Sequence, residues 1–390
     1  MSGNGLAGRT AIVGVGATEF SKESGRTEMR LAVEAASMAL EDAGLSPKDV
    51  DGLATFTMDS NEEIEVACNL GAGDLTFFSR IHFGGGAACA TVHQAAMAVA
   101  TGEANVVVCY RALNGRSWNR FGASAHSKPT AERIHYGWYF PFGLTTPASW
   151  VALHSRRYMH TFGATGEDLG RVAVAHREFA ATNPHAWFYG KPITLDDHQC
   201  SRWIVEPLRL LDCCQESDGG VAVIVTTAER ARDLRQPPAI IRAASQGSGA
   251  EQEEMTSYYR NDLTRLPEAE VVARRLWANS GIGPRDVQTA VIYDPFTPFV
   301  LMQLEAFGFC GPGEGAGFVR DKGIGPGGAL PVNTNGGQLG EGYIHGMNGI
   351  AEGVRQVRGS AANQVANVEN VLVTSGVGVP TSGLVLGVDR

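Results

Sequence analysis

A twelve-residue stretch occurs twice in this chain, and the repetition limits the folds that the chain can adopt. Ala43-Gly-Leu-Ser-Pro-Lys-Asp-Val-Asp-Gly-Leu-Ala54 aligns without a gap with Ser280-Gly-Ile-Gly-Pro-Arg-Asp-Val-Gln-Thr-Ala-Val291. Each copy follows apolar residues at helical spacing, at about 29–43 and 268–279, and each leads into a predicted strand. The helix–Gly–x–x–Pro–strand connection is common in proteins, but Gly, Pro, Asp and Val matching in register favour an internal duplication.

The order of the predicted elements indicates an α/β protein built from two similar halves. We expect the first half over residues 1–235 and the second over 236–390, and we expect the first to carry an insertion at about 114–222. Each half should end with a glycine-rich turn, a helix (about 87–101 and 346–357) and a strand. A structureless loop as long as the insertion would be unusual, so we predict a helical region that covers the substrate.

Composition and charge exclude several classes of protein. The 390 residues contain 32 Lys and Arg against 41 Asp and Glu, a net charge of −9, which argues against a nucleic-acid or anionic-membrane binder. We find no apolar run long enough to span a membrane and no signal peptide, so we expect a cytoplasmic protein with seven reduced cysteines. Their spacing, and that of the histidines, predicts no metal site.

Glycine is abundant, at 49 residues, and two glycine-rich turns are candidate binding sites. Gly14-Val-Gly16 begins like a dinucleotide-binding fingerprint but lacks its third glycine, so it is better explained by packing at a strand end. Gly84-Gly-Gly86 precedes a helix, where free N–H groups would suit a thioester oxygen that becomes negative during a reaction. A tight turn packed against another helix explains this spacing equally well.

At these residues the sequence resembles the thiolase superfamily, whose members are two such halves with an inserted loop domain. The resemblance covers nearly the whole chain and implies a thiolase-like fold, with two βαβαβαββ halves in an α/β/α/β/α layered core. Alignment of the nucleophile helix, counted back from Gly102-Glu-Ala-Asn105, places the family's nucleophilic cysteine at Gly85. Cys89 falls one helical turn further on, where we expect it to be buried, so thiolase activity through Cys89 is not favoured.

The other family motifs are also changed in this chain. The N-E-A-F block aligns with Tyr293-Asp-Pro-Phe296, which puts Tyr293 at the asparagine position. The G-H-P-x-G block aligns with Gly342-Tyr-Ile-His-Gly346, which puts Tyr343 at the catalytic histidine. The C-terminal C-x-G aligns with Thr374-Ser-Gly376, which puts Thr374 at the second cysteine. The resemblance therefore implies a retained scaffold without the Cys/His/Cys chemistry.

A chain altered in this way cannot form an acyl-cysteine, but it keeps the parts that would stabilise a thioester enolate. By alignment the enolate would be bound by backbone N–H groups of Gly85 and Gly376, with Tyr293 and Tyr343 as proton carriers. His345 and Asp294 are possible supporting residues, and His345 is an alternative to Tyr343. Retro-aldol cleavage of a β-hydroxyacyl-CoA has these requirements and needs no cofactor or metal, since CoA is part of the substrate.

Within the superfamily the chain is most similar to the lipid-transfer-protein-type branch and its steroid side-chain-cleaving aldolases. The resemblance implies a 17-hydroxy-steroid substrate with a 20-carboxyl-CoA side chain, and 17-ketosteroid and propionyl-CoA as products. It also implies a homodimeric core with a small OB-fold, acyl-CoA-binding partner subunit, together a heterotetramer. The alternative is an inactive acyl-CoA or sterol carrier in which the tyrosines only fill a vacated pocket. The aromatic run 136–142 would face the steroid or belong to the core.

Overall fold

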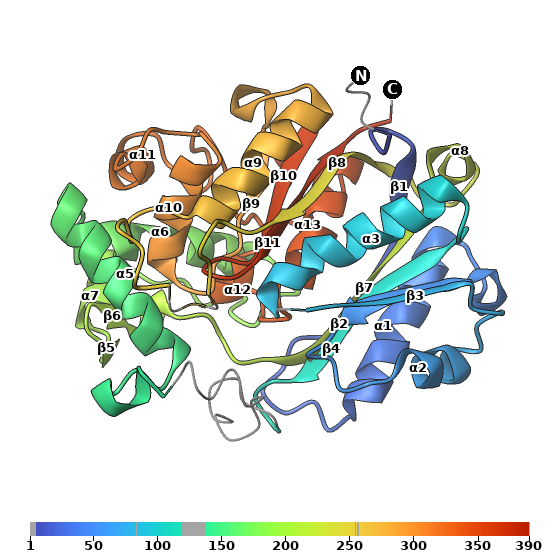
Figure 1. Ribbon diagram of the computed structural model, residues 1–390, viewed down its shortest axis with the longest axis horizontal. Coiled ribbons are helices and arrows are strands. Elements are labelled where there is room, and N and C mark those ends of the chain that lie inside the picture. Colours follow the sequence, from blue (N-terminus) through green and yellow to red (C-terminus); the bar gives the residue numbers. More distant parts are fainter. Residues whose placement is uncertain (1–4, 83, 119–136, 254, 256, 390) are drawn as a thin grey trace.

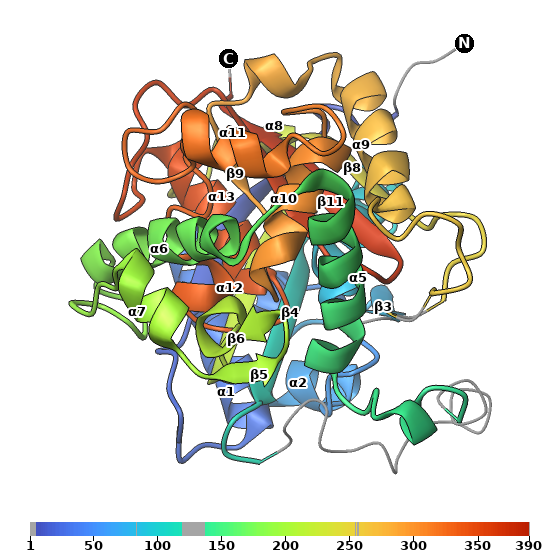
Figure 2. The same ribbon diagram turned by 90° about the vertical axis from the view of Figure 1, so that its left-hand side faces the viewer.

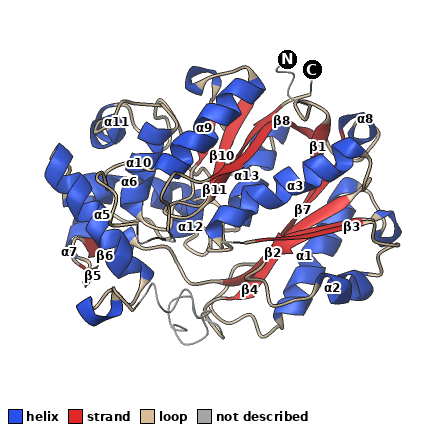
Figure 3. Cartoon of the chain, in the orientation of Figure 1, coloured by secondary structure: helices blue, strands red, loops and turns tan. Residues whose placement is uncertain are grey.

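The computed structural model describes residues 5–82, 84–118, 137–253, 255 and 257–389. The first half contains β1 (Thr10–Ala17), α1 (Glu28–Ala43), β2 (Gly52–Phe56), α2 (Glu63–Leu70), β3 (Phe77–Ile81), α3 (Ala88–Thr101), β4 (Val107–Asn114) and β7 (Asp218–Thr227). The second contains β8 (Ala239–Gly247), α9 (Pro267–Ser280), β9 (Thr289–Val291), α10 (Thr297–Ala306), α11 (Gly315–Asp321), α12 (Gly337–Gly340), α13 (Met347–Arg358), β10 (Asn370–Ser375) and β11 (Thr381–Gly387). Figures 1 and 3 show the strands between helices.

The repeated sequence folds in the same way in both halves, which confirms the duplication. α1 and α9 both end at a glycine in the left-handed conformation, Gly44 (φ 74°) and Gly281 (φ 72°). A single 3₁₀ turn follows each helix, over Pro47–Asp49 and Pro284–Asp286. In each turn the aspartate accepts a hydrogen bond at 2.8 Å from the backbone N–H three residues earlier. The identical capping explains why Pro and Asp occur in both copies.

The two halves form one nine-stranded sheet among the described residues, in the order β3-β2-β4-β7-β1-β8-β11-β10-β9. The strands of each half follow the same order, and the first strands, β1 and β8, join the halves through the antiparallel pair Ala11 and Ile240. The counterpart of β3 in the second half is reduced to a single parallel bridge between Ala290 and Val332. The predicted internal symmetry is therefore present, with one strand shortened.

Helices α3 and α13 lie between the strands of the two halves, and both contact strands from each half. On the outer faces, α1 packs on β1, β4 and β7, and α9 packs on β8 and β11 (Figure 1). α3 can be buried because its inward positions are small, including Ala88, Ala95 and Ala96, each fully buried. This arrangement confirms the predicted α/β/α/β/α layering and brings the starts of α3 and α13 close to the ends of β9 and β10.

The insertion is helical, as predicted. It contains α5 (Pro147–Phe162), α6 (Gly166–Thr182), α7 (Leu195–Cys200) and a short hairpin of β5 (Trp203–Val205) and β6 (Leu208–Arg209) (Figure 2). The expected end of the insertion at residue 222 falls inside β7, a central strand that begins at Asp218. α6 packs on α10, α11 and α12, so the insertion rests on the second half. Within the described residues, no helix is both long and apolar enough to cross a membrane.

Candidate active site

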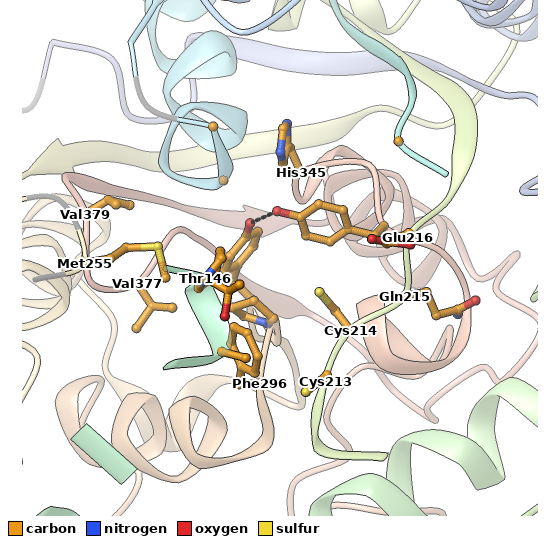
Figure 4. Close-up of a pocket in the computed structure, with 18 of the residues that line it drawn as sticks. Thr146, Cys213, Cys214, Gln215, Glu216, Met255, Phe296, His345, Val377 and Val379 are labelled. Carbon is orange, nitrogen blue, oxygen red and sulfur yellow. Dashed lines mark hydrogen bonds between the residues drawn. The ribbon is translucent and has the colours of Figure 1, made fainter. Parts of the chain in front are cut away.

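The hydroxyl groups of Tyr293 and Tyr343 lie 3.3 Å apart and form a hydrogen bond, drawn as a dashed line in Figure 4. Tyr293 follows β9, and Tyr343 lies in the loop between α12 and α13. The backbone N–H of Tyr343 donates to the hydroxyl of Ser217 at 3.0 Å, which holds this loop against the first half. The structure thus brings together the two tyrosines that the sequence singled out fifty residues apart.

The two phenols border a cavity of about 450 Å³, a size typical of small-molecule sites. Most of its wall is apolar, and Figure 4 shows Met255, Phe296, Val377 and Val379 around it. The wall combines segments from both halves and from the insertion, which contributes Thr146 and Cys214 among others. A ligand in this cavity would therefore contact mainly apolar atoms, and the polar side chains of the lining are the two phenols, Thr146, Gln215, Glu216 and His345.

Burial controls the protonation of both tyrosines. Removal from water disfavours the phenolate, so the pKa of Tyr343 is raised above its ordinary value of 10. The pKa of Tyr293 is raised well above 10 by burial first and by the neighbouring Tyr343 second. Both phenols are consequently neutral at pH 7, and each can donate a proton or accept one while passing its own to the other.

The two predicted enolate-binding glycines lie in loops that touch each other. Gly85 lines the cavity, whereas Gly376 is adjacent to the lining residue Val377 and does not line it. A side chain at Gly376, whose φ is +84°, would come within 2.5 Å of Gly86 Cα, so only glycine allows this approach. The hydroxyl of Ser375, next to Gly376, donates to Gly85 O, and the hydroxyl of Ser382 in β11 donates to Gly86 O at 2.7 Å. Gly85 begins a helical turn, so its N–H has no partner within that turn.

His345 lies on the far side of the tyrosine pair from Phe296 in Figure 4, and its ring packs edge-on against Tyr343 with ring centres 5.0 Å apart. Arg111 donates from Nε to His345 Nδ1 at 3.1 Å and pairs with Asp59 at 2.8 Å. Burial and the Arg111 charge lower the pKa of His345 well below its usual range. A neutral ring whose Nδ1 accepts this bond carries its proton on Nε2, so His345 has no lone pair for use as a base.

Asp294 is buried but does not line the cavity. Its carboxylate accepts the backbone N–H of Gln338 at 2.8 Å, at the start of α12, and contacts His176 Nδ1 at 2.9 Å. Negative charge at a helix N-terminus is stabilising. Asp294 therefore joins the segment after β9 to the start of α12, the helix that precedes the Tyr343 loop. Its hydrogen bonds do not include either phenol.

The cysteines are all unpaired. Cys89 is fully buried, and burial raises the pKa of its thiol, which makes it a poor nucleophile. Cys213 and Cys214 line the cavity, a role that sequence reasoning did not assign, although they end the segment Pro207–Cys214 that resembles the aldolase branch. Burial raises the pKa of Cys213 to about 12. Burial also raises the pKa of Cys214, so both thiols are protonated at pH 7, and a thiol is a poorer nucleophile than a thiolate. No cluster of three metal-ligating side chains occurs within the described ranges.

The aromatic run 136–142 does not match either expectation. Tyr136 lies outside the described residues, whereas Trp138 and Phe142 are 74% and 81% exposed. Neither lines the cavity. Tyr139 packs edge-on against Tyr258 with ring centres 5.3 Å apart. The wall of the cavity is instead built from other side chains of both halves and of the insertion, including Phe296 and Met255.

Comparison with known proteins gives a consistent family assignment. Residues 7–229 match the family of the thiolase N-terminal domain, and residues 249–386 match the thiolase C-terminal domain-like family. The steroid side-chain-cleaving aldolase of Thermomonospora curvata is 62% identical and covers 99% of both chains. The 17-hydroxy-3-oxo-4-pregnene-20-carboxyl-CoA lyase of Mycobacterium tuberculosis is 63% identical, over 98% of this chain and 100% of that one. A solved Ltp2-ChsH2(DUF35) aldolase has a TM-score of 0.96, with 62% identity over 99% of both chains.

Proposed function

The chain belongs to the thiolase family, and we propose that this protein is the member that cleaves the side chain of a steroid acyl-CoA. It is a carbon–carbon lyase, an aldolase that acts on a CoA thioester. The proposed substrate is a 17-hydroxy-steroid with a 20-carboxyl-CoA side chain, and the products are a 17-ketosteroid and propionyl-CoA. The observation that carries this proposal is the hydrogen-bonded pair of neutral phenols in the wall of a mainly apolar cavity.

The reaction balances without any group beyond the substrate and the chain. Retro-aldol cleavage breaks the bond between Cα and the carbon that bears the hydroxyl group. The electron pair of that bond goes to the thioester, which becomes an enolate, while the hydroxyl carbon becomes a ketone. One proton moves from the hydroxyl oxygen to Cα, and no electron is gained or lost. CoA is part of the substrate, and we propose no other cofactor.

Tyr293 and Tyr343 are suited to move this proton. One phenol oxygen takes the hydroxyl proton while its own proton passes along the 3.3 Å hydrogen bond, and the second phenol protonates Cα. Because neither phenol has to be ionised beforehand, the raised pKa values of both side chains agree with this relay. We assign stabilisation of the enolate oxygen to the backbone N–H groups of Gly85 and Gly376, which would act where negative charge develops.

The direct test replaces each phenol and measures product. Tyr293→Phe and Tyr343→Phe should each lower kcat for release of 17-ketosteroid and propionyl-CoA by at least about 10²-fold, a typical effect of removing a proton-transfer group. Tyr189→Phe, at an exposed tyrosine outside the cavity, is the matched control and should keep full activity. Wild-type rates in both active-site variants would overturn the assignment. Ligand binding without ketone release by the wild-type protein would support the alternative, a thiolase-like carrier.

We also propose that two copies of the chain associate through β3, the edge strand of the sheet. Among the described residues no strand pairs with the outer side of β3, and unpaired edges are templates for another strand. Phe78 on β3 and Ile64 on α2 are 65% and 72% exposed, and burial of these large apolar side chains in a dimer would be favourable. Phe78→Glu should convert a dimer to a monomer in sedimentation velocity, and an unchanged mass would exclude this surface.

A heteromeric assembly is the remaining part of the proposal. The solved relative is an aldolase complex whose second component carries the DUF35 designation. We propose a small partner subunit of this kind, with an OB fold that binds the acyl-CoA, in a heterotetramer around the homodimer. Co-expression followed by size-exclusion chromatography tests this directly. We also propose a cytoplasmic location, in agreement with a CoA substrate and seven unpaired cysteines.

A further inference from the structure

Three buried groups form a closed circuit of hydrogen bonds around the peptide unit of Tyr293. The backbone N–H of Tyr293 donates to Thr374 Oγ1 at 2.9 Å. The Thr374 hydroxyl donates to Gln303 Oε1 at 2.7 Å, and Gln303 Nε2 donates back to Tyr293 O at 2.7 Å. Thr374 is 2% exposed and Gln303 is fully buried, so water does not compete for these bonds.

The direction of each bond in the circuit is forced by its partners. Gln303 Nε2 faces two backbone carbonyls, those of Tyr293 and Phe299, and a carbonyl can only accept. The amide nitrogen must therefore be on that side, and Oε1 must face Thr374. An amide oxygen only accepts, so the Thr374 hydroxyl is the donor there and its oxygen is free to accept from Tyr293 N–H. A side chain without a hydroxyl at position 374 breaks two bonds at once.

The circuit comes from three separate parts of the second half. Tyr293 follows β9, Gln303 lies in α10, and Thr374 lies near the end of β10. By alignment Thr374 occupies the position of the family's second cysteine. A thiol is a weak donor and a weak acceptor, so a cysteine there would hold the Tyr293 peptide less firmly. In this chain the position borders the backbone of a proposed proton carrier and lies outside the cavity lining.

We propose that Thr374 and Gln303 are positioning residues that hold Tyr293 where its phenol meets Tyr343 and the substrate. This inference rests on the proposed role of Tyr293. Tyr293 is 6% exposed, and its hydroxyl lies 3.3 Å from that of Tyr343, so a small rotation of the Tyr293 peptide would separate the two phenols. A displacement of about 1 Å at a reacting group can cost roughly 10²-fold in rate. The circuit prevents that displacement without touching the substrate.

The variants that test this proposal are Thr374→Val, which keeps the shape and removes the hydroxyl, and Thr374→Ser, which keeps the hydroxyl. Thr374→Val should lower kcat about 10- to 100-fold with KM nearly unchanged. Thr374→Ser should recover most of the loss. Thr101→Val, which removes a hydroxyl on the exposed end of α3, is the matched control and should have wild-type kinetics. If Thr374→Val does not fold, Thr374→Cys replaces it with the same expected direction of change.

Two further measurements separate positioning from a general structural effect. In a Tyr293→Phe background Thr374→Val should cause no additional loss, because the group through which it acts is already gone. The Tyr293 phenol should also ionise closer to pH 10 in Thr374→Val, measured as the absorbance difference at 295 nm from the Tyr293→Phe protein, because it leaves its dry position. An equal loss in both backgrounds, or wild-type kcat with unchanged ionisation, would overturn the proposal. Full activity of Tyr293→Phe alone would instead disprove the proposed function.

Discussion

A side chain at position 85 and the phenol of Tyr293 cannot occupy the structure together, because a Cβ built on Gly85 would overlap the hydroxyl oxygen and Cζ of Tyr293. Gly346 makes room on the other side of the same ring, where a Cβ would lie 3.1 Å from Cδ2. Position 85 is also the one that aligns with the family's nucleophilic cysteine. Loss of the nucleophile and gain of the phenol are therefore one structural change, in which the aromatic ring fills the space that a cysteine would need.

Gly85→Ala is expected to lower kcat by at least about 10²-fold, because the added methyl group displaces the Tyr293 phenol from Tyr343. Steady-state kinetics measure the effect. Gly317→Ala is the control, since a Cβ there meets nothing within 4 Å and the residue lies in α11. Thermal melts provide an independent check: Gly85→Ala should destabilise the wild-type protein more than a Tyr293→Ala protein, where the space is free. Equal losses of stability in the two backgrounds would contradict the steric argument.

The pH dependence of catalysis should show no loss from tyrosine ionisation near pH 10. The relay uses protonated phenols, and burial raises the pKa of both Tyr293 and Tyr343 above 10. Raised pKa values keep the phenols neutral to higher pH, so kcat should stay level from pH 8 to about 10, where a tyrosine in water is half ionised. Circular dichroism at each pH distinguishes unfolding from ionisation. A basic limb with an apparent pKa at or below 10 that is lost in a tyrosine variant would refute this.

The pattern of the sequence could predict the elements and the positions of the tyrosines, because both depend on local spacing. The Pro and Asp of each repeat specify the same 3₁₀ turn, and a family alignment is sufficient to place Tyr293 and Tyr343 at neighbouring motif positions. The direction in which a side chain points cannot be predicted in this way, because it depends on contacts with distant residues. Asp294, next to Tyr293 in the chain, turns toward the N-terminus of α12, and nothing in the local sequence indicates that choice.

Long-range partners account for most of what sequence reasoning missed. Arg111 lies in the middle of the buried strand β4, and its contact with His345 joins residues from opposite halves of the chain. Periodicity predicts the elements on which the two residues lie, but it does not predict which residue of a distant element each side chain contacts. The same holds for Thr374 and Gln303, whose roles depend on how β10 and α10 pack beside β9. The cavity wall likewise consists of residues from several distant segments, which become neighbours only in the folded chain.

Glu341 should make the protein less stable as the pH rises toward neutrality. Its carboxyl group is buried beside the Tyr343 loop, accepts bonds from Asn335 and Asn348, and has its pKa raised from 4.5 to about 7 by burial. A raised folded-state pKa means that the folded protein binds the proton more tightly. The stabilising contribution is therefore complete below about pH 4.5 and is lost as the pH rises through about 7, on the order of 3 kcal/mol at most.

Urea denaturation at several pH values tests this expectation, with Glu341→Gln as the comparison. The glutamine keeps an acceptor for the asparagine amides but cannot titrate, so the free energy of unfolding of the variant should decline less between pH 5 and pH 8 than that of the wild-type protein. The charged side chains near the group, Arg355 and Glu352, are present in both proteins. Parallel stability curves for the two proteins would show that Glu341 does not titrate in this range.

Breaking the buried pair of Arg111 and Asp59 should be strongly destabilising. Their side chains are 5% and 0% exposed and lie 2.8 Å apart, and Asp59 also accepts the backbone N–H of Ala112 at 3.1 Å. Arg111→Met leaves the Asp59 carboxylate buried without its charge partner, which costs about 3–5 kcal/mol in comparable pairs. The substitution also removes the hydrogen bond to His345 Nδ1 and the charge that lowers the pKa of its ring. His345 should then become easier to protonate, and kcat should gain an acidic limb.

Two variants separate the effect of the unpaired charge from the loss of the arginine side chain. Asp59→Asn in the Arg111→Met background removes the stranded charge and should recover part of the free energy of unfolding, measured by urea denaturation. Arg156→Met disrupts the exposed pair with Glu206, whose side chains are 54% and 68% exposed, and should change stability little because exposed pairs contribute little. If Arg111→Met were no more destabilising than Arg156→Met, the buried pair would not stabilise the strand that carries Arg111.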